Sequence, residues 1–200
     1  MSLKRMVSPA AVLRLTKHMG HMVTASGAAD PELDSTGGAG MDTTKKTIIL
    51  FSGDFDRVMA AFIIANGAAA MGDDVTMFFT FWGLNILRRT EKVQTKDKKS
   101  TLQAMFGKMM PKGTRKLGLS KMNFAGMGAP MMKRVMKGAG AMSLEELVDS
   151  AKEQGVKFIA CTLSMDILGF KEEEMIDGLE YAGVAAYLGE ADEANVNLFI

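Results

Sequence analysis

Cysteine is almost absent from this chain, since Cys161 is the only one among its 200 residues. A single cysteine excludes a disulfide within the chain and cannot build a cysteine-rich metal site. The two histidines, His18 and His21, lie far from Cys161 in the sequence, which argues against a paired cysteine and histidine nucleophile. We therefore expect neither a metal ion nor a cofactor.

Long apolar runs are lacking as well, and none reaches the roughly 18 residues that a membrane-spanning helix needs. Near the start, Arg14 interrupts the apolar stretch that follows Lys4 and Arg5, so this stretch is too short for a secretory signal. No glycine fingerprint of a dinucleotide site follows a predicted strand, and there is no P-loop sequence. We expect a cytoplasmic protein, with attachment to the periphery of a membrane as a further hypothesis.

The net charge of +1 hides an uneven distribution of charge along the chain. Residues 88–137 include 14 basic and two acidic residues, whereas residues 145–193 include 13 acidic and three basic ones. Such blocks indicate complementary faces that meet in an oligomer, a basic surface for an anionic partner, or simply two solvated surfaces. Because aromatic residues are not interleaved with the basic ones, we expect no nucleic-acid partner.

Residues 1–44 differ in composition from the rest of the chain. The spacing of apolar residues predicts a helix over about residues 9–23, and the small residues that follow are typical of a flexible linker. We expect this segment to be loosely attached to a folded domain over residues 45–200.

Strands and helices alternate in the predicted domain. An apolar strand at 47–51, a helix at 55–71 and a strand at 75–80 form a βαβ unit with a parallel pair of strands. A helix then ends near Gly155, and a second strand–helix series is expected at 156–161 (strand), 164–168 (helix), 172–179 (helix), 184–188 (strand), 191–194 (helical turn) and 196–200 (strand). This order predicts an α/β sheet of about five strands with helices on both faces.

Methionine is concentrated between these two halves. Residues 88–142 hold nine of the 19 methionines and most of the lysines. Methionine side chains are flexible and suit adaptable binding surfaces, so this insertion is interpreted as a mobile lid, an interface arm or a membrane-surface segment. The alternative is a pair of ordinary amphipathic helices with methionine as core filler.

Three loops follow the predicted strands and should meet at one edge of the sheet, where α/β proteins form pockets. Their candidate pocket residues are Ser52, Gly53 and Asp54 in the first loop, Phe81, Trp82 and Gly83 in the second, and Thr162 and Ser164 after Cys161 in the third. Backbone N–H groups and the dipole of the following helix would favour a Cys161 thiolate there. Composition alone favours the alternative, a small buried hydrophobe.

Four segments in order, residues 48–54, 61–72, 78–85 and 160–166, resemble the DsrE/DsrF-like family of small sulfur-relay proteins. The resemblance is to the branch often labelled as peroxiredoxin-family or as an accessory domain of coenzyme A-disulfide reductases. It runs from about Lys46 to Ile200, so residues 1–44 lie outside it.

The resemblance implies a Rossmann-like or flavodoxin-like three-layer sandwich, assembled as a homotrimer or a multiple of it. Members receive sulfane sulfur on a cysteine as a persulfide and pass it on, which implies sulfur donor and acceptor proteins as partners. Cys161 falls on the family's cysteine position after its fourth strand, so the resemblance favours a reactive thiol. Thr162 and Ser164 are then candidates for holding the anion, with Asp54 and Trp82 on the opposite pocket wall.

Two departures from the family pattern limit the mechanism. The second cysteine that some relatives carry is missing, so a two-cysteine peroxidase cycle cannot run within one subunit. The peroxidatic loop framed by threonine and arginine is also missing. We therefore predict a sulfur carrier or sulfurtransferase that uses Cys161. The alternatives are a non-catalytic oligomeric or membrane-surface module and a small-ligand or nucleotide-binding α/β domain.

Overall fold

The computed structural model describes residues 44–95 and 99–200. The helix expected over residues 9–23, the linker after it and the two histidines lie outside the described residues. The domain boundary expected near residue 44 therefore stays a prediction.

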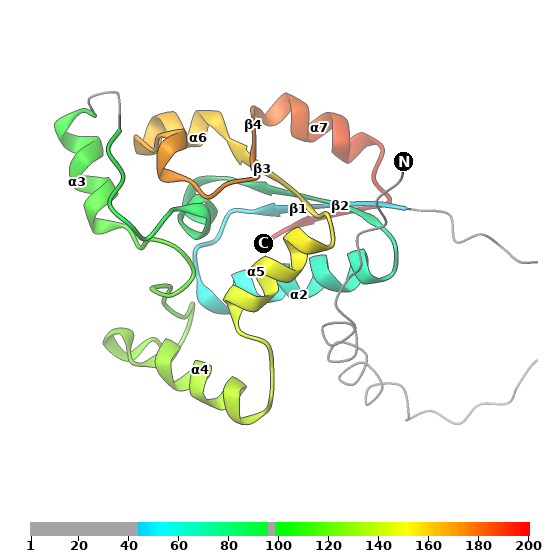
Figure 1. Ribbon diagram of the computed structural model, residues 1–200, viewed down its shortest axis with the longest axis horizontal. Helices are drawn as coiled ribbons and strands as arrows, with labels where there is room; N and C mark the ends of the chain where they lie inside the picture. Colours follow the sequence, from blue (N-terminus) through cyan, green and yellow to red (C-terminus); the bar gives the residue numbers. More distant parts are fainter. Residues whose placement is uncertain (1–43, 96–98) are drawn as a thin grey trace, which may run out of the picture. The chain divides into compact units, whose positions relative to one another are not determined.

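The described chain forms a sheet of five parallel strands in the order β4-β3-β2-β1-β5 (Figure 1). The strands are β1 Lys45–Leu50, β2 Asp74–Phe79, β3 Lys157–Cys161, β4 Glu180–Ala182 and β5 Val196–Phe199. The three central strands are mostly buried, as parallel strands between two helical layers must be. The predicted fold class, a three-layer α/β sandwich of about five mostly parallel strands, is confirmed.

Helices lie on both faces of this sheet. They are α2 Phe55–Ala70, α3 Thr101–Met109, α4 Gly128–Gly138, α5 Leu144–Glu153, α6 Thr162–Leu168 and α7 Val184–Asp192, with the 3-10 helices η1 Phe81–Leu87, η2 Phe124–Gly126 and η3 Glu172–Glu174. Helices α2 and α5 pack side by side on one face, and α7 covers the other (Figure 1). The larger core lies under α2 and α5, where the rings of Phe62, Phe79 and Phe158 contact one another.

The strand order explains why the two faces carry different helices. Right-handed crossovers from β1 to β2 and from β2 to β3 move in one direction across the sheet, so α2 and α5 lie on the same face. The last connection returns from β4 to the far side of β1, and a right-handed crossover in that direction places α7 on the opposite face. The order therefore reverses between β1 and β5, where sheets of this kind form a crevice at the carboxyl ends.

The elements after Cys161 differ from the sequence prediction. The strand expected at 184–188 is the first part of α7, and the fourth strand is Glu180–Ala182 instead. The helix expected at 172–179 is only the short η3. A three-residue strand is too short to show an alternating pattern. The apolar residues at the start of α7, in contrast, resemble a buried strand in the sequence. Cys161 ends β3, the third strand along the chain, as the order of the predicted strands implies.

Between β2 and β3 the chain forms the two helices α3 and α4, but their methionines are not core filler. Six of the nine methionines in residues 88–142 are exposed, namely Met105, Met109, Met122, Met127, Met131 and Met132. Only Met110 among the nine is buried. The core-filler interpretation is therefore wrong for most of them.

A buried arginine fixes this segment to the rest of the domain. Arg88 follows η1, is 2% exposed, and donates through Nη2 to the backbone oxygen of Gly107 at 2.9 Å. Its Nη1 lies 3.4 Å from both Asn85 Oδ1 and the Pro111 oxygen, and its guanidinium carbon lies 4.2 Å from the centre of the Phe170 ring. Burial lowers the pKa of Arg88, and its Nε has no acceptor among the described residues. Arg88 thus joins η1, the end of α3 and the residue after the α6 cap.

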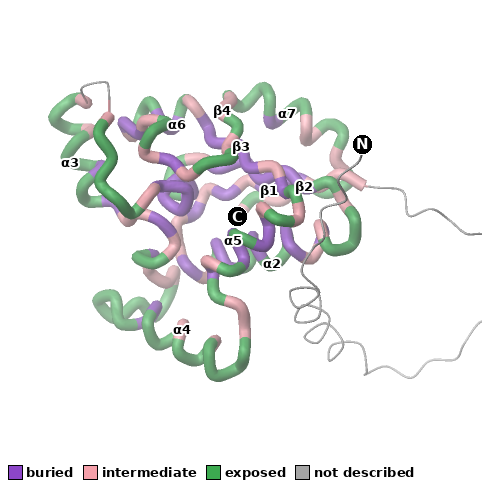
Figure 2. The backbone as a smooth tube through the Cα atoms, in the orientation of Figure 1, coloured by how far each residue is buried: buried purple, intermediate pink, exposed green. Residues whose placement is uncertain are grey.

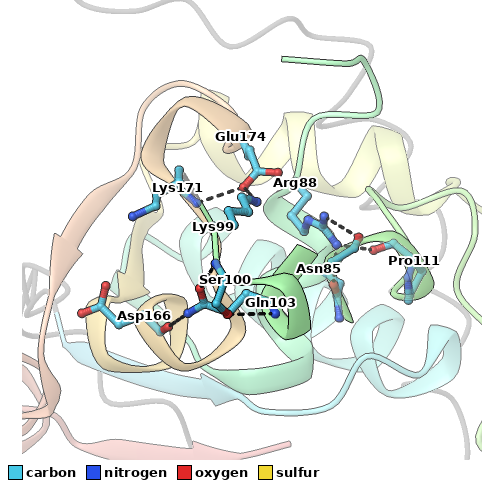
Figure 3. A network of polar contacts seen from close by, with 10 residues as sticks. Asn85, Arg88, Lys99, Ser100, Gln103, Pro111, Asp166, Lys171 and Glu174 are labelled. Atoms are coloured by element: carbon cyan, nitrogen blue, oxygen red, sulfur yellow. Dashed lines mark hydrogen bonds and ion pairs between the residues drawn. The ribbon is translucent and has the colours of Figure 1, made fainter. Parts of the chain in front are cut away.

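A second set of contacts holds α3 against α6. The Gln103 side chain donates to the backbone oxygen of Asp166 at 2.9 Å (Figure 3). The left-handed Gly169 ends α6 so close to α3 that a Cβ there would lie 2.5 Å from the Cβ of Gln103. Nearby, Lys99 pairs with Glu174, and both side chains are largely buried. Burial raises the pKa of Glu174, but hydrogen bonds, above all from Lys99, outweigh it and hold that pKa below its ordinary value of 4.5.

Replacing Arg88 should destabilise the domain. We expect Arg88→Ala to lower the free energy of unfolding by about 2–4 kcal/mol, because it removes the ring contact and leaves buried backbone oxygens without a donor. Urea unfolding measures this loss. The matched control is Arg134→Ala, since Arg134 is exposed on α4, and its effect should stay within about 0.5 kcal/mol. Equal losses in the two variants would contradict an anchoring role for Arg88.

The pair of Lys99 and Glu174 should make stability depend on acid. A carboxyl whose pKa is lower in the folded than in the unfolded protein stabilises the fold at neutral pH and loses this contribution as the pH falls through its folded pKa. The unfolding free energy of the wild type should therefore exceed that of Glu174→Gln at neutral pH, and this gap should close below about pH 4. Glu173→Gln, at an exposed neighbour, is the control. A gap that persists unchanged in acid would show that the Glu174 charge contributes nothing.

Candidate functional site

Cys161 is the last residue of β3 and immediately precedes α6. Its side chain is 5% exposed and belongs to a small apolar cluster with Phe78, Ile159 and Tyr187, on the sheet face that α7 covers. The thiol forms no capping hydrogen bond to α6. The structure therefore places the thiol at the expected strand end, in apolar surroundings.

Hydroxyl groups join the end of β2 to α6. Thr80 Oγ1 and Ser164 Oγ lie 2.8 Å apart, and Ser164 is buried. Because the Ser164 hydroxyl is engaged by Thr80, it orients the first turn of α6 next to Cys161. Thr162, in the same turn, is half-buried.

The loop after β1 is closed by its own side chains. The Asp54 backbone N–H donates to Ser52 Oγ at 3.1 Å, and the Ser52 hydroxyl donates to Asp54 Oδ2 at 3.2 Å. Arg57 Nε lies 3.6 Å from the same Asp54 oxygen. The backbone N–H of Ser120 donates to Asp56 at 2.8 Å. Burial raises the pKa of Asp56, but the hydrogen bonds from Ser120 outweigh burial and hold that pKa below its ordinary value. The carboxylates in this loop are therefore occupied by structural contacts.

Close backbone contacts bind this loop to η1. A Cβ on Gly83 would lie 2.0 Å from the Leu50 oxygen, so only glycine allows η1 to start this close to the end of β1. A Cβ on Gly53 would lie 3.1 Å from the Trp82 oxygen. Phe81 adopts a left-handed φ of 44°, which is strained for a residue with a side chain. The second predicted loop is thus a tight helical turn that packs on the first.

The predicted pocket residues consequently fall into two groups along one edge of the sheet. The first comprises Ser52, Gly53, Asp54, Phe81, Trp82 and Gly83 around the ends of β1 and β2, and the second comprises Cys161, Thr162 and Ser164 at the end of β3. Strands β1 and β3 are two strand spacings, about 10 Å, apart. The apolar neighbours of the thiol include no member of the first group. The structure links the groups through the contact of Thr80 with Ser164.

Sequence reasoning missed an open row of aromatic rings on the thiol's side of the sheet. The Phe51 ring lies 5.6 Å from that of Phe81 and 5.8 Å from that of Phe199, between ring centres. Phe51 follows Ile49 by two residues, so it shares the sheet face of Ile49 and the Cys161 cluster. Phe199 is 69% exposed. It is the one aromatic residue of the short strand β5, so the sequence contains no repeating pattern from which this row could be predicted. The carboxyl edge of the sheet on this side therefore carries exposed aromatic side chains.

The basic and acidic blocks of the sequence meet within one molecule. Three ion pairs join them, namely Arg89 with Asp177 at 2.5 Å, Lys99 with Glu174, and Arg115 with Glu145 at 3.7 Å. Complementary faces on different subunits are therefore not needed to explain the acidic block, which is partly neutralised inside the chain.

The described residues also bear on whether the chain has a metal site, a ligand cavity or a membrane-spanning helix. Over residues 44–95 and 99–200 no group of three or more histidine, cysteine or carboxylate side chains is placed to hold a metal ion. A cavity of about 340 Å³ lies at the amino ends of the strands, lined by Lys45, Thr76 and Lys157 among others, and Cys161 is not part of it. None of the described helices has the length and apolarity to cross a membrane.

Comparison with known proteins gives the chain its family. It matches the sequence profile of the DsrE/DsrF/DrsH-like family over residues 42–199. It is 58% identical over 158 residues to YrkE, an uncharacterized protein of Bacillus subtilis, which covers 79% of this chain and 98% of YrkE. It is 38% identical over 164 residues to the sulfur carrier protein DsrE2 of Allochromatium vinosum, which covers 80% of this chain and 100% of that protein.

Two solved structures also align with 78% of this chain and 99% of their own. They are the ychN protein from E. coli, with a TM-score of 0.45 and 12% identity, and MTH1491 from Methanobacterium thermoautotrophicum, with a TM-score of 0.47 and 14% identity. The family assignment rests on the sequence profile and on the two relatives instead. The chain belongs to the DsrE/DsrF/DrsH-like family.

Proposed function

We propose that this protein carries sulfane sulfur as a persulfide on Cys161 and passes it to a thiol of a partner protein. The observation that carries the proposal is the 38% identity, over its full length, to a protein named as a sulfur carrier. Cys161 is the one thiol of this chain, so a persulfide has no other place to form.

The place of Cys161 in the fold supports this role. Ligands of open α/β sheets bind at the carboxyl ends of the strands, where Cys161 lies. The first N–H groups of α6 have no partners within the helix and favour a negative charge beside them. Because the thiol is 5% exposed, sulfur transfer requires that side chains around it move when the donor or acceptor binds.

The chemistry needs only thiol exchange. The Cys161 thiolate attacks the outer sulfur of a donor persulfide, a new sulfur–sulfur bond forms, and the donor leaves as a thiolate that takes up a proton. An acceptor thiolate then attacks the outer sulfur on Cys161 and releases the Cys161 thiolate. No electrons are gained or lost overall, so the cycle needs neither oxidant nor cofactor.

Cys161→Ser should abolish persulfide formation. After incubation with a persulfide or polysulfide donor, the intact mass of the wild type should increase in steps of one sulfur atom, whereas that of the variant should not change. Urea unfolding of both proteins checks that the variant keeps its fold. A wild-type protein that never gains sulfur would rule the proposal out, and so would an equal gain by Cys161→Ser.

We further propose that the chain works as a homo-oligomer, a trimer or a multiple of it, that covers the open aromatic row. The row exposes Phe199 and Phe81 beside the sheet face of Cys161, and exposed aromatic groups are typical of protein interfaces. Exposed apolar residues of α7, Val184 and Leu188, lie on the helix that covers the same face. A neighbouring subunit there would close the surroundings of the thiol.

Phe199→Glu should dissociate such an oligomer, because association would bury an unpaired carboxylate. Sedimentation velocity should show a lower mass for the variant than for the wild type at the same concentration. Met71→Glu, at a comparably exposed position next to α2, is the control and should leave the mass unchanged. The proposed interface fails if the wild type is a monomer or if Phe199→Glu keeps its mass.

A further inference from the structure

Helix α3 is oriented with its apolar face toward the solvent. Its large apolar residues lie at positions i, i+3, i+4 and i+7, which places them on one face. They are Leu102, Met105, Phe106 and Met109, and they are between 49% and 75% exposed. The opposite side of the helix, with Gln103 and Gly107, is the one held by α6 and Arg88. The domain therefore anchors α3 through polar contacts and leaves its apolar face free.

Helix α4 repeats this arrangement. Met131, Met132 and Val135 are exposed, whereas Ala129 is buried and Lys133 faces the domain, with its Nζ 5.0 Å from the centre of the Phe55 ring. Both helices lie beyond the carboxyl ends of the strands, on the side of the domain where β3 ends in Cys161 (Figure 1). Figure 2 shows how much of α3 and α4 is exposed.

A strained turn between the two helices presents further apolar groups. Met122, Phe124 and Ala125 all have left-handed φ values, of 56°, 40° and 54°. Such conformations cost free energy and persist only where the surrounding structure imposes them. Here Gly128 packs so tightly that a Cβ would lie 2.2 Å from the Met122 oxygen. The turn holds both Met122 and Phe124 in an exposed position.

The segment that carries these apolar faces has charged side chains of one sign. Lys108, Lys116, Lys121, Arg134 and Lys137 are exposed and form no ion pair with any of the described residues. No acidic residue occurs from residue 98 to residue 144. Exposed apolar groups next to unpaired cations match an anionic lipid surface, where a layer of negative headgroups covers an apolar interior.

We propose that α3, α4 and the turn at 122–126 dock this protein on the surface of a bilayer that contains anionic lipids. The apolar side chains enter the boundary between headgroups and acyl chains, and the lysines and arginines contact the headgroups. A protein partner is the less favoured occupant, because the apolar residues are spread over two separate helices and a turn, and the charged side chains of this segment are all positive. This docking turns the carboxyl edge of the sheet, and with it the Cys161 end of β3, toward the membrane.

The experiment measures co-sedimentation of the full chain with vesicles. The protein should bind vesicles of phosphatidylcholine mixed with phosphatidylglycerol, and binding should fall with added salt and be weak for phosphatidylcholine alone. The triple variant Leu102→Gln, Phe106→Gln and Met109→Gln should reduce partitioning about tenfold or more, because it removes apolar area that enters the bilayer. All three positions are exposed, so the fold should be unaffected.

The matched control carries the same three changes at exposed apolar positions of another face, Ile63→Gln, Ile64→Gln and Met71→Gln, and should bind like the wild type. The proposal is overturned if the wild type does not bind anionic vesicles, if the α3 variant binds as well as the wild type, or if the control loses as much. It is also overturned if the α3 variant lowers the mass of the protein in solution, since the face is then a contact between subunits. Persulfide loading is measured separately, and its failure would leave the membrane result standing.

Discussion

The parallel direction of all five strands is the constraint on which the rest of the molecule depends. It brings every strand's carboxyl end to one edge, so the β1 loop, η1, α6 and the connection through α3 and α4 start from or return to the same side. The backbone segments at this edge are closely packed, because Gly83 at the start of η1 directly contacts the Leu50 oxygen at the end of β1. The thiol, the aromatic row and the exposed helices all lie along this edge for this reason.

Helix α6 joins two parts of the molecule that have different roles. Its first turn follows Cys161 and is oriented by the hydroxyl of Thr80, while its end at Gly169 receives α3. A helix of seven residues is about 10 Å long, so the anchor of α3 and the thiol are separated by little more than one short rigid element. The polar contacts of Arg88, Gln103 and Glu174 fix this arrangement (Figure 3).

The elements that have a clear hydrophobic pattern were predicted correctly from the sequence. The strands that became β1, β2, β3 and β5, the long helix α2 and the position of Cys161 all follow from apolar runs with clear stops. The sequence-based prediction failed for elements whose type depends on their length or on tertiary contacts. The three residues of β4 are too few to show a hydrophobic pattern, and the apolar start of α7 resembles a strand. The prediction also assigned Arg88 to a charged surface, since burial of a single arginine depends on backbone oxygens and a ring brought in from distant positions. The division of the pocket into two groups depends on strand order, which no local pattern contains.

The anchor of α3 is made largely of backbone. Arg88 binds the carbonyl oxygens of Gly107 and Pro111, and Gln103 binds that of Asp166, so side chains at these acceptor positions do not enter the bonds. Amino-acid changes on the outer side of α3 therefore leave the attachment intact. The two sides of this helix are therefore under separate structural constraints: contacts with the domain restrict the inner side, and none of these contacts restricts the outer side.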